Sequence, residues 1–243
     1  MQIVPAILPK NFKELETQMT EVVGLVPVVQ IDICDGVFVK NSTWPYGGRI
    51  GAFTDPSWRA IESEEEGMPY WDSVDIELDL MVADPKETLE KLIKIGPTRI
   101  VFHYASLGTD PVAFFQTLDP YYGSTMKIGI ALTPNMSVDL IAPLIPYIHF
   151  VQCMGIERVG FQGQSFDERT LVLVSSIHAT YPELEISVDG AVSFENIDDL
   201  IEAGVTRLVI GSALWNAENP RAELQTFQTH VGIETVEEDD DML

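Results

Sequence analysis

The chain has few cysteines, few basic residues and no long hydrophobic run, and each shortage excludes a class of protein. Only Cys34 and Cys153 occur in 243 residues, so we expect no structural disulfide and a reducing, cytoplasmic location. No signal-like apolar segment follows Met1, and no run approaches the roughly 20 residues that span a bilayer. Lys and Arg number 14 against 38 Asp and Glu, for a net charge of -24. Neither nucleic acid nor an anionic membrane is therefore an expected partner.

Length and hydrophobic content allow one large domain or two small ones. A chain of 243 residues that is 46% hydrophobic can bury a full core, and a single α/β barrel needs about this length. No linker or break in composition divides residues 1–230, which we assign to that domain. The acidic run EEDDD near the carboxyl end is typical of a solvated tail, and we predict that residues 231–243 are disordered.

Strand and helix patterns alternate along the whole chain. Asn11 and Glu14 resemble an N-cap and its acidic partner, and they open a helix after the first strand. Eight such units favour a closed barrel over an open sheet, so the predicted fold class is α/β: a single (β/α)8 TIM barrel with a parallel eight-stranded core. The expected strands lie near 2–7, 28–34, 76–81, 99–103, 127–132, 149–153, 185–189 and 207–210, and helices near 56–65, 86–95, 111–118 and 217–230.

Acidic side chains alternate with aliphatic ones in three predicted strands, VVQIDIC, DIELDLM and LEISVDG. Taken alone, the first could be a half-exposed strand with its polar face in water. In a parallel barrel, helices cover the outer face, so the polar face should point inward. Asp32, Asp79 and Asp189 then lie near the carboxyl ends of their strands, where barrel enzymes place their chemistry. Buried carboxylates must be paired, protonated or metal-bound, which makes these three the candidate site.

Glycine-rich turns follow the last three predicted strands, reading GFQGQSF, DGA and GSA. Glycine lets backbone N–H groups approach an anion, and many barrels bind phosphate after strands seven and eight. Each turn alone is also compatible with simple strand-to-helix geometry. Backbone amides would allow so acidic a protein to hold an anionic ligand. The candidate phosphate-binding residues are Gly160, Gly163, Gly190, Ala191, Gly211 and Ser212.

Six ordered motifs resemble the ribulose-phosphate 3-epimerase family, from Ile3 to about Pro220. They are PAILPKNF, IDICDGVFVKN, LDLMV, GFQGQSF, SVDGAVSFENI and AGVTRLVIGSALW. The resemblance implies an isomerase, a carbohydrate-phosphate epimerase of pentose phosphate metabolism, that interconverts D-ribulose 5-phosphate and D-xylulose 5-phosphate. By position, Asp32 and Asp189 would be its two catalytic acids, and Met81 would form an apolar wall beneath the substrate. Two carboxylates on opposite faces can invert a carbon beside a ketone if their pKa values are raised.

The sequence departs from this family where the family holds a divalent metal. Gln30 and Asp79 replace the two family histidines, and Ala6 replaces a serine that contacts the substrate. The oxygen donors of Gln30, Asp32, Asp79 and Asp189 would favour Mg²⁺ or Mn²⁺ over Zn²⁺. The alternative is a diverged, non-catalytic sugar-phosphate-binding barrel that has lost the metal. A decarboxylase on the same scaffold would need a lysine between two acids of the second strand, and that lysine is missing here.

Other features carry weaker expectations. His103 matches a family histidine outside the metal shell, and a packed, hydrogen-bonded role is favoured over one in which it supplies charge to the site. Cys34 and Cys153 are expected to be small buried hydrophobic residues. The long connection at 37–55 is expected to be functional because loops of this length in compact domains usually are. Helix faces leave open whether the chain forms a homo-oligomer.

Overall fold

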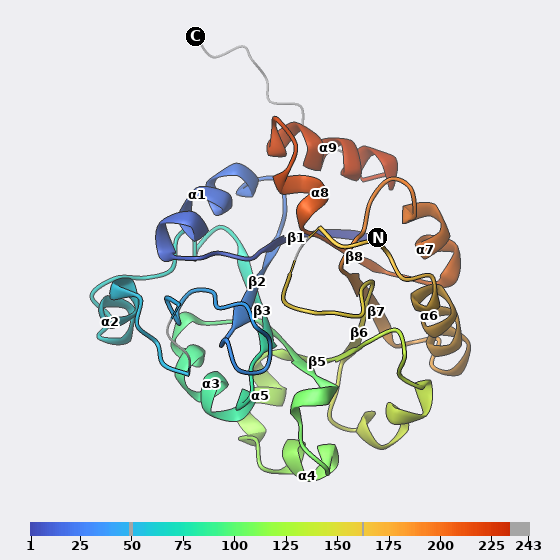
Figure 1. Ribbon diagram of the computed structural model, residues 1–243, viewed down its shortest axis with the longest axis horizontal. Helices are drawn as coiled ribbons and strands as arrows, with labels where there is room; N and C mark the ends of the chain where they lie inside the picture. Colours follow the sequence, from blue (N-terminus) through green and yellow to red (C-terminus); the bar gives the residue numbers. More distant parts are fainter. Residues whose placement is uncertain (49–50, 162, 234–243) are drawn as a thin grey trace.

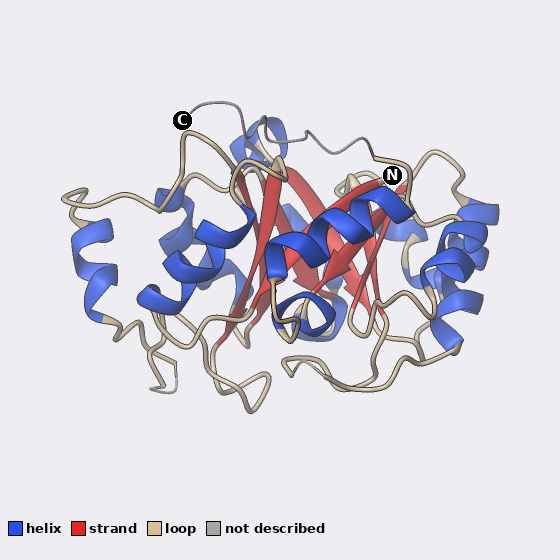
Figure 2. Cartoon of the chain, turned by 90° about the horizontal axis from the view of Figure 1, so that it is seen from above, coloured by secondary structure: helices blue, strands red, loops and turns tan. Residues whose placement is uncertain are grey.

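The computed structural model describes residues 1–48, 51–161 and 163–233. Each strand pairs in parallel with the next, and the eighth pairs with the first, so the sheet closes into a barrel. Helices surround this barrel (Figure 1), and strands occupy the centre in the perpendicular view (Figure 2). The predicted fold class is confirmed. The strands are β1 (Gln2–Ile7), β2 (Val28–Cys34), β3 (Asp75–Met81), β4 (Arg99–His103), β5 (Lys127–Leu132), β6 (Phe150–Met154), β7 (Glu185–Asp189) and β8 (Arg207–Ile210).

Most helices begin at a recurring sequence signal. Five of them start with proline directly after Asp or Asn, and in each case the preceding side chain accepts a hydrogen bond from a first-turn backbone N–H. Proline needs no hydrogen-bond acceptor at that position, and the cap satisfies a donor that the helix leaves unpaired. The helices are α1 (Phe12–Val22), α2 (Pro56–Glu62), α3 (Pro85–Leu92), α4 (Pro111–Gln116), α5 (Pro120–Thr125), α6 (Arg169–Thr180), α7 (Ile197–Ala203), α8 (Ser212–Trp215) and α9 (Pro220–His230).

The expected helix after β5 is wrong. The described segment 133–149 contains only two 3₁₀ turns, η3 (Val138–Leu140) and η4 (Ala142–Leu144). Pro143 and Pro146 lack the backbone N–H that an α-helix needs in its interior, which explains the failure. Other boundaries shift by a few residues: α3 continues into the 3₁₀ turn η1 (Ile93–Ile95), η2 (Tyr104–Ser106) follows β4, and α5 and α8 are separate short helices.

The barrel interior is polar at two levels. At the amino-terminal end, Glu77 is fully buried and pairs with Arg99 and Arg207, at 2.5 and 2.9 Å, and Arg99 also bonds Glu185. The Arg99 guanidinium also makes a cation–π contact in this layer, 4.0 Å from the Phe150 ring centroid. Buried charges are tolerated when they are paired in this way. The second level, near the carboxyl ends of the strands, contains the candidate site.

Aliphatic side chains on the outer face of the strands pack against the helices in the main hydrophobic core, as the alternation predicts. Cys153 belongs to that core, whereas Cys34 packs with Met81 and Val39 at the barrel mouth. Both thiols are free and buried. Among the described helices, none is long and apolar enough to cross a membrane. The predicted acidic tail begins at residue 231, but Val231 and Ile233 pack against the main core. From residue 234 onward, the tail lies outside the described residues.

Candidate functional site

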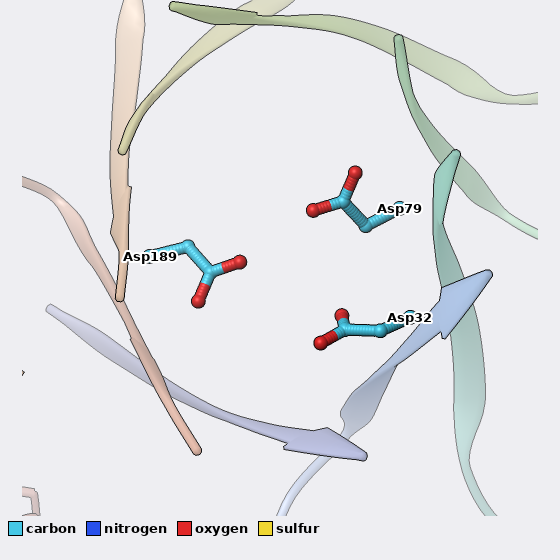
Figure 3. Close-up of side chains that lie close together, drawn as sticks. All are labelled: Asp32, Asp79 and Asp189. Carbon is cyan, nitrogen blue, oxygen red and sulfur yellow. The ribbon is translucent and has the colours of Figure 1, made fainter. Parts of the chain in front are cut away.

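Three aspartates converge inside the barrel (Figure 3). Asp32 on β2 and Asp79 on β3 are directly paired in the strand register, and Asp189 on β7 points toward them from across the barrel. Their relative exposures are 5%, 0% and 8%, and one carboxylate oxygen from each lies within 4.8 Å of the others. The structure thus brings together the three acids that the alternation singled out.

Hydrogen bonds from the next loop fix the end of β2. The Thr43 hydroxyl donates to the Asp32 carbonyl oxygen at 2.7 Å and accepts the Cys34 N–H at 2.8 Å. The buried Asp35 carboxylate accepts the N–H groups of Val37 and Phe38 and, at 2.7 Å, that of Ala83 beyond β3. These bonds tie the ends of β2 and β3 together and set the directions of Asp32 and Asp79.

A buried network of amides and an imidazole surrounds the carboxylates. Gln30 Nε2 donates to Asp32 Oδ1 and Asp189 Oδ2, both at 2.9 Å. Gln152 Nε2 on β6 donates to Asp79 Oδ2 at 3.1 Å and to Asp189 Oδ2 at 3.3 Å. His103 Nε2 lies 2.8 Å from Asp79 Oδ1. Both oxygens of Asp79 are therefore engaged, whereas Asp32 and Asp189 are each held through one oxygen.

Burial and mutual repulsion hold protons in this cluster. Burial, then the charges of Asp189 and Asp79, raise the pKa of Asp32 well above its usual range. Burial, then the charge of Asp79, raises the pKa of Asp189 to about 7. The Gln30 amide opposes both increases because its N–H stabilises the ionised forms. The raised pKa values of Asp32 and Asp189 therefore favour protonation of this pair closer to neutral pH than is usual for a carboxylate.

A pocket opens above the carboxylates. Asp32, Asp189 and Met81 line it, together with Met154 and Leu8. Its remaining wall includes all six glycine-turn candidates: Gly160, Gly163, Gly190, Ala191, Gly211 and Ser212. Gln30 and Asp79 are not among the residues that line it. The segment after β6, coloured yellow in Figure 1, runs over this end of the barrel.

Two glycines in the pocket wall are required by close packing. Gly190 has φ +101°, and a Cβ there would lie 2.9 Å from the Ile156 side chain. Gly160 has φ +88°, and a Cβ there would lie 2.8 Å from Val39. Asn41 Nδ2 also donates to the Gly160 carbonyl oxygen at 3.0 Å, so the loops after β2 and β6 meet at the mouth. This contact places Asn41, from the segment 37–55, beside the pocket wall.

The donor set fits a small divalent cation. Three carboxylates converge, and the amide oxygen of Gln30 is buried without a hydrogen-bond partner among the described residues. Oxygen donors of this kind suit Mg²⁺ or Mn²⁺. In the structure Gln30 turns its nitrogen, not the expected oxygen, toward the carboxylates; a half-turn of the amide would exchange the two atoms.

Sequence reasoning missed Gln152 and favoured a role outside the site for His103. Nothing drew attention to Gln152, although it stands in a buried strand where an aliphatic residue would be usual. His103 was expected to be packed and hydrogen-bonded, and it is, but its partner proves to be Asp79 within the site. The inward alternation of β6, which also points Met154 into the pocket, was the available signal for Gln152.

The chain is similar to known proteins over nearly its full length. A model of the "Ribulose-phosphate 3 epimerase family" matches residues 2–215. Ribulose-phosphate 3-epimerase of Schizosaccharomyces pombe is 26% identical over 231 residues, covering 95% of this chain and 93% of that protein. The cytoplasmic isoform of the same enzyme from Oryza sativa subsp. japonica is 28% identical over 234 residues, covering 95% and 94%.

Solved structures are similar in fold. KGPDC from Streptococcus mutans in complex with D-R5P superimposes with a TM-score of 0.67 at 15% identity, covering 95% of this chain and 96% of that one. A 3-hexulose-6-phosphate synthase superimposes with a TM-score of 0.65 at 14% identity, covering 94% and 99%. At these low sequence identities, the similarity shows a shared barrel fold and nothing about function.

Proposed function

Because this chain belongs to the ribulose-phosphate 3-epimerase family, we propose that it inverts C3 of a ketose phosphate and interconverts D-ribulose 5-phosphate and D-xylulose 5-phosphate. The observation that carries the proposal is the position of Asp32 and Asp189. They approach one pocket from opposite sides of the barrel, and the pKa of each is raised.

Inversion beside a ketone needs one ionised and one protonated group. One carboxylate removes the C3 proton, and the C–H electron pair forms the C2–C3 double bond while the C2 carbonyl becomes an oxyanion. The carboxylic acid opposite then returns a proton to the other face of C3, and the carbonyl re-forms. Asp32 and Asp189 suit these roles because raised pKa values let one of them keep a proton near neutral pH.

Each catalytic carboxylate presents one oxygen to this chemistry. Gln30 holds Asp32 through Oδ1 and Asp189 through Oδ2, which leaves the second oxygen of each without a hydrogen-bond partner among the described residues. Asp79 differs, because His103 and Gln152 occupy both of its oxygens. We assign it to the support of the site and not to proton transfer.

The substrate phosphate would be held by backbone N–H groups. Gly190, Ala191, Gly211 and Ser212 form one wall of the pocket, at the ends of β7 and β8. No Lys or Arg side chain lines this pocket in the described part of the chain, so neutral N–H donors must supply the attraction. Gly163, in the loop after β6, would close over the bound ligand.

A divalent cation would be held by Asp32, Asp79 and Asp189, with Gln30 contributing its amide oxygen after a half-turn. Such a cation would stabilise the negative charge that develops on the substrate oxygens. Mg²⁺ or Mn²⁺ fits these oxygen donors better than Zn²⁺.

The competing function is a sugar-phosphate-binding protein without catalysis, which the fully hydrogen-bonded state of Asp79 favours. Exchange of the C3 proton in deuterated water separates the two. We expect deuterium at C3 of D-ribulose 5-phosphate, measured by proton NMR with chelator, Mg²⁺, Mn²⁺ or Zn²⁺ present. If the phosphate compound binds but C3 exchanges under none of these conditions, the binding protein is the correct assignment.

A further inference from the structure

Gln152 is a fully buried glutamine in the middle of β6. Its Nε2 reaches two carboxylates from other strands, Asp79 on β3 and Asp189 on β7, and it lies 3.9 Å from Met154 Sδ. Its Oε1 has no hydrogen-bond partner among the described residues. A buried amide is costly unless its hydrogen bonds compensate, and those to the two carboxylates are the compensation present here.

The position of Gln152 addresses a specific electrostatic problem. Asp79 and Asp189 repel each other, and little water is available to screen them because both are buried. One amide nitrogen placed between them gives each carboxylate a donor. Hydrogen bonds to charged groups are stronger than those between neutral groups, so the pair is held by a side chain that an aliphatic residue could not replace.

We propose that Gln152 is a positioning residue that fixes Asp189 through Oδ2 and ties it to Asp79. Gln30 bonds the same oxygen of Asp189 from β2. The two amides therefore hold this oxygen from two directions and set the orientation of the whole carboxylate. Only the description of Asp189 as catalytic rests on the proposed function.

Stability measurements test the contact without any assay of activity. Gln152→Met keeps the length of the side chain and removes the amide. In chelator, equilibrium unfolding in urea is measured for the parent, Gln152→Met, Asp189→Ala and the double variant. Gln152→Met should raise the equilibrium constant for unfolding by some factor in the parent. We expect this factor to be at least about tenfold smaller in the Asp189→Ala background.

The matched control is Gln228→Met. Gln228 is also a buried glutamine, but its Nε2 donates to the Leu25 carbonyl oxygen, away from the site. The loss of stability caused by Gln228→Met should be the same in the parent and in the Asp189→Ala background. Equal losses of stability for Gln152→Met in both backgrounds would show that Gln152 does not hold Asp189, and would overturn the inference.

Kinetics test the positioning role itself. Gln152→Met should lower kcat at least about tenfold with little change in KM, because the glycine turns that hold the phosphate are untouched. A change confined to KM would contradict the role. If the parent enzyme shows no C3 exchange, the proposed function fails, and with it the description of Asp189 as a catalytic group. If the parent is active but Gln152→Met costs the same stability in both backgrounds, only the Gln152 inference fails.

Discussion

The raised pKa of Asp189 predicts how stability depends on pH. Burial and then the charge of Asp79 move this pKa from 3.8 in the reference state to about 7 in the folded protein. Between these values the folded state binds the proton and the unfolded state has released it. Binding of this proton by Asp189 stabilises the folded state. Its contribution to the free energy of unfolding is therefore complete below pH 3.8 and is lost as pH rises through about 7.

The size of the effect follows from the pKa difference. A difference of about three, at about 1.4 kcal/mol for each unit, corresponds to about 4 kcal/mol. Asp189 is only 8% exposed, so solvent screens this contribution little. In Asp189→Asn the titrating group is absent, and the stability of the parent relative to the variant should fall by about this amount between pH 4 and pH 8.

The assay is urea unfolding in chelator at half-unit steps of pH, comparing the parent with Asp189→Asn. Asp72→Asn is the matched control, because Asp72 is an exposed carboxylate outside the site that accepts a hydrogen bond from the Ser73 hydroxyl, a group that does not titrate in this range. The control should follow the parent across the range where Asp189 titrates. Parallel pH profiles for the parent and Asp189→Asn would refute the claim that Asp189 keeps a proton in the folded protein.

Three further predictions concern catalysis, phosphate binding and the metal. Asp32→Asn and Asp189→Asn should each reduce turnover at least about 10²-fold in a coupled assay, with phosphate affinity measured by calorimetry nearly unchanged; retained turnover in either would exclude the two-base mechanism. Gly211→Leu should weaken sugar-phosphate binding, measured by calorimetry, because the larger side chain keeps the anion from the backbone N–H groups; unchanged affinity would refute this placement. Gln30→His with Asp79→His should shift metal preference toward Zn²⁺ or Fe²⁺, measured by metal analysis and thermal stability, and an unchanged preference would contradict the assigned ligands.

The sequence predicted the barrel and its three carboxylates because both follow from local periodicity. Alternation in β2, β3 and β7 determines which side chains face inward, and parallel closure then brings Asp32, Asp79 and Asp189 to one end. The glycine turns were equally accessible, and the structure gathers all of them in the pocket wall with Met81. Motif order supplied the family, which the match over residues 2–215 confirms.

The remaining features depend on contacts between distant strands. Gln152 meets Asp79 across a separation of 73 residues, and His103 reaches the same carboxylate from β4. No local pattern encodes such pairs. The orientation of the Gln30 amide is similar, because only the positions of Asp32 and Asp189 decide which of its atoms faces inward. The missing helix after β5 is a different error, since its prolines were visible in the sequence and were given too little weight.

The most direct test of the central claim is a crystal structure of the chain with D-ribulose 5-phosphate bound. We predict that C3 lies between the carboxylates of Asp32 and Asp189, one on each face, with the phosphate against the N–H groups of Gly190 and Gly211. Both carboxylates on the same face of C3, or a phosphate bound away from these turns, would contradict the account.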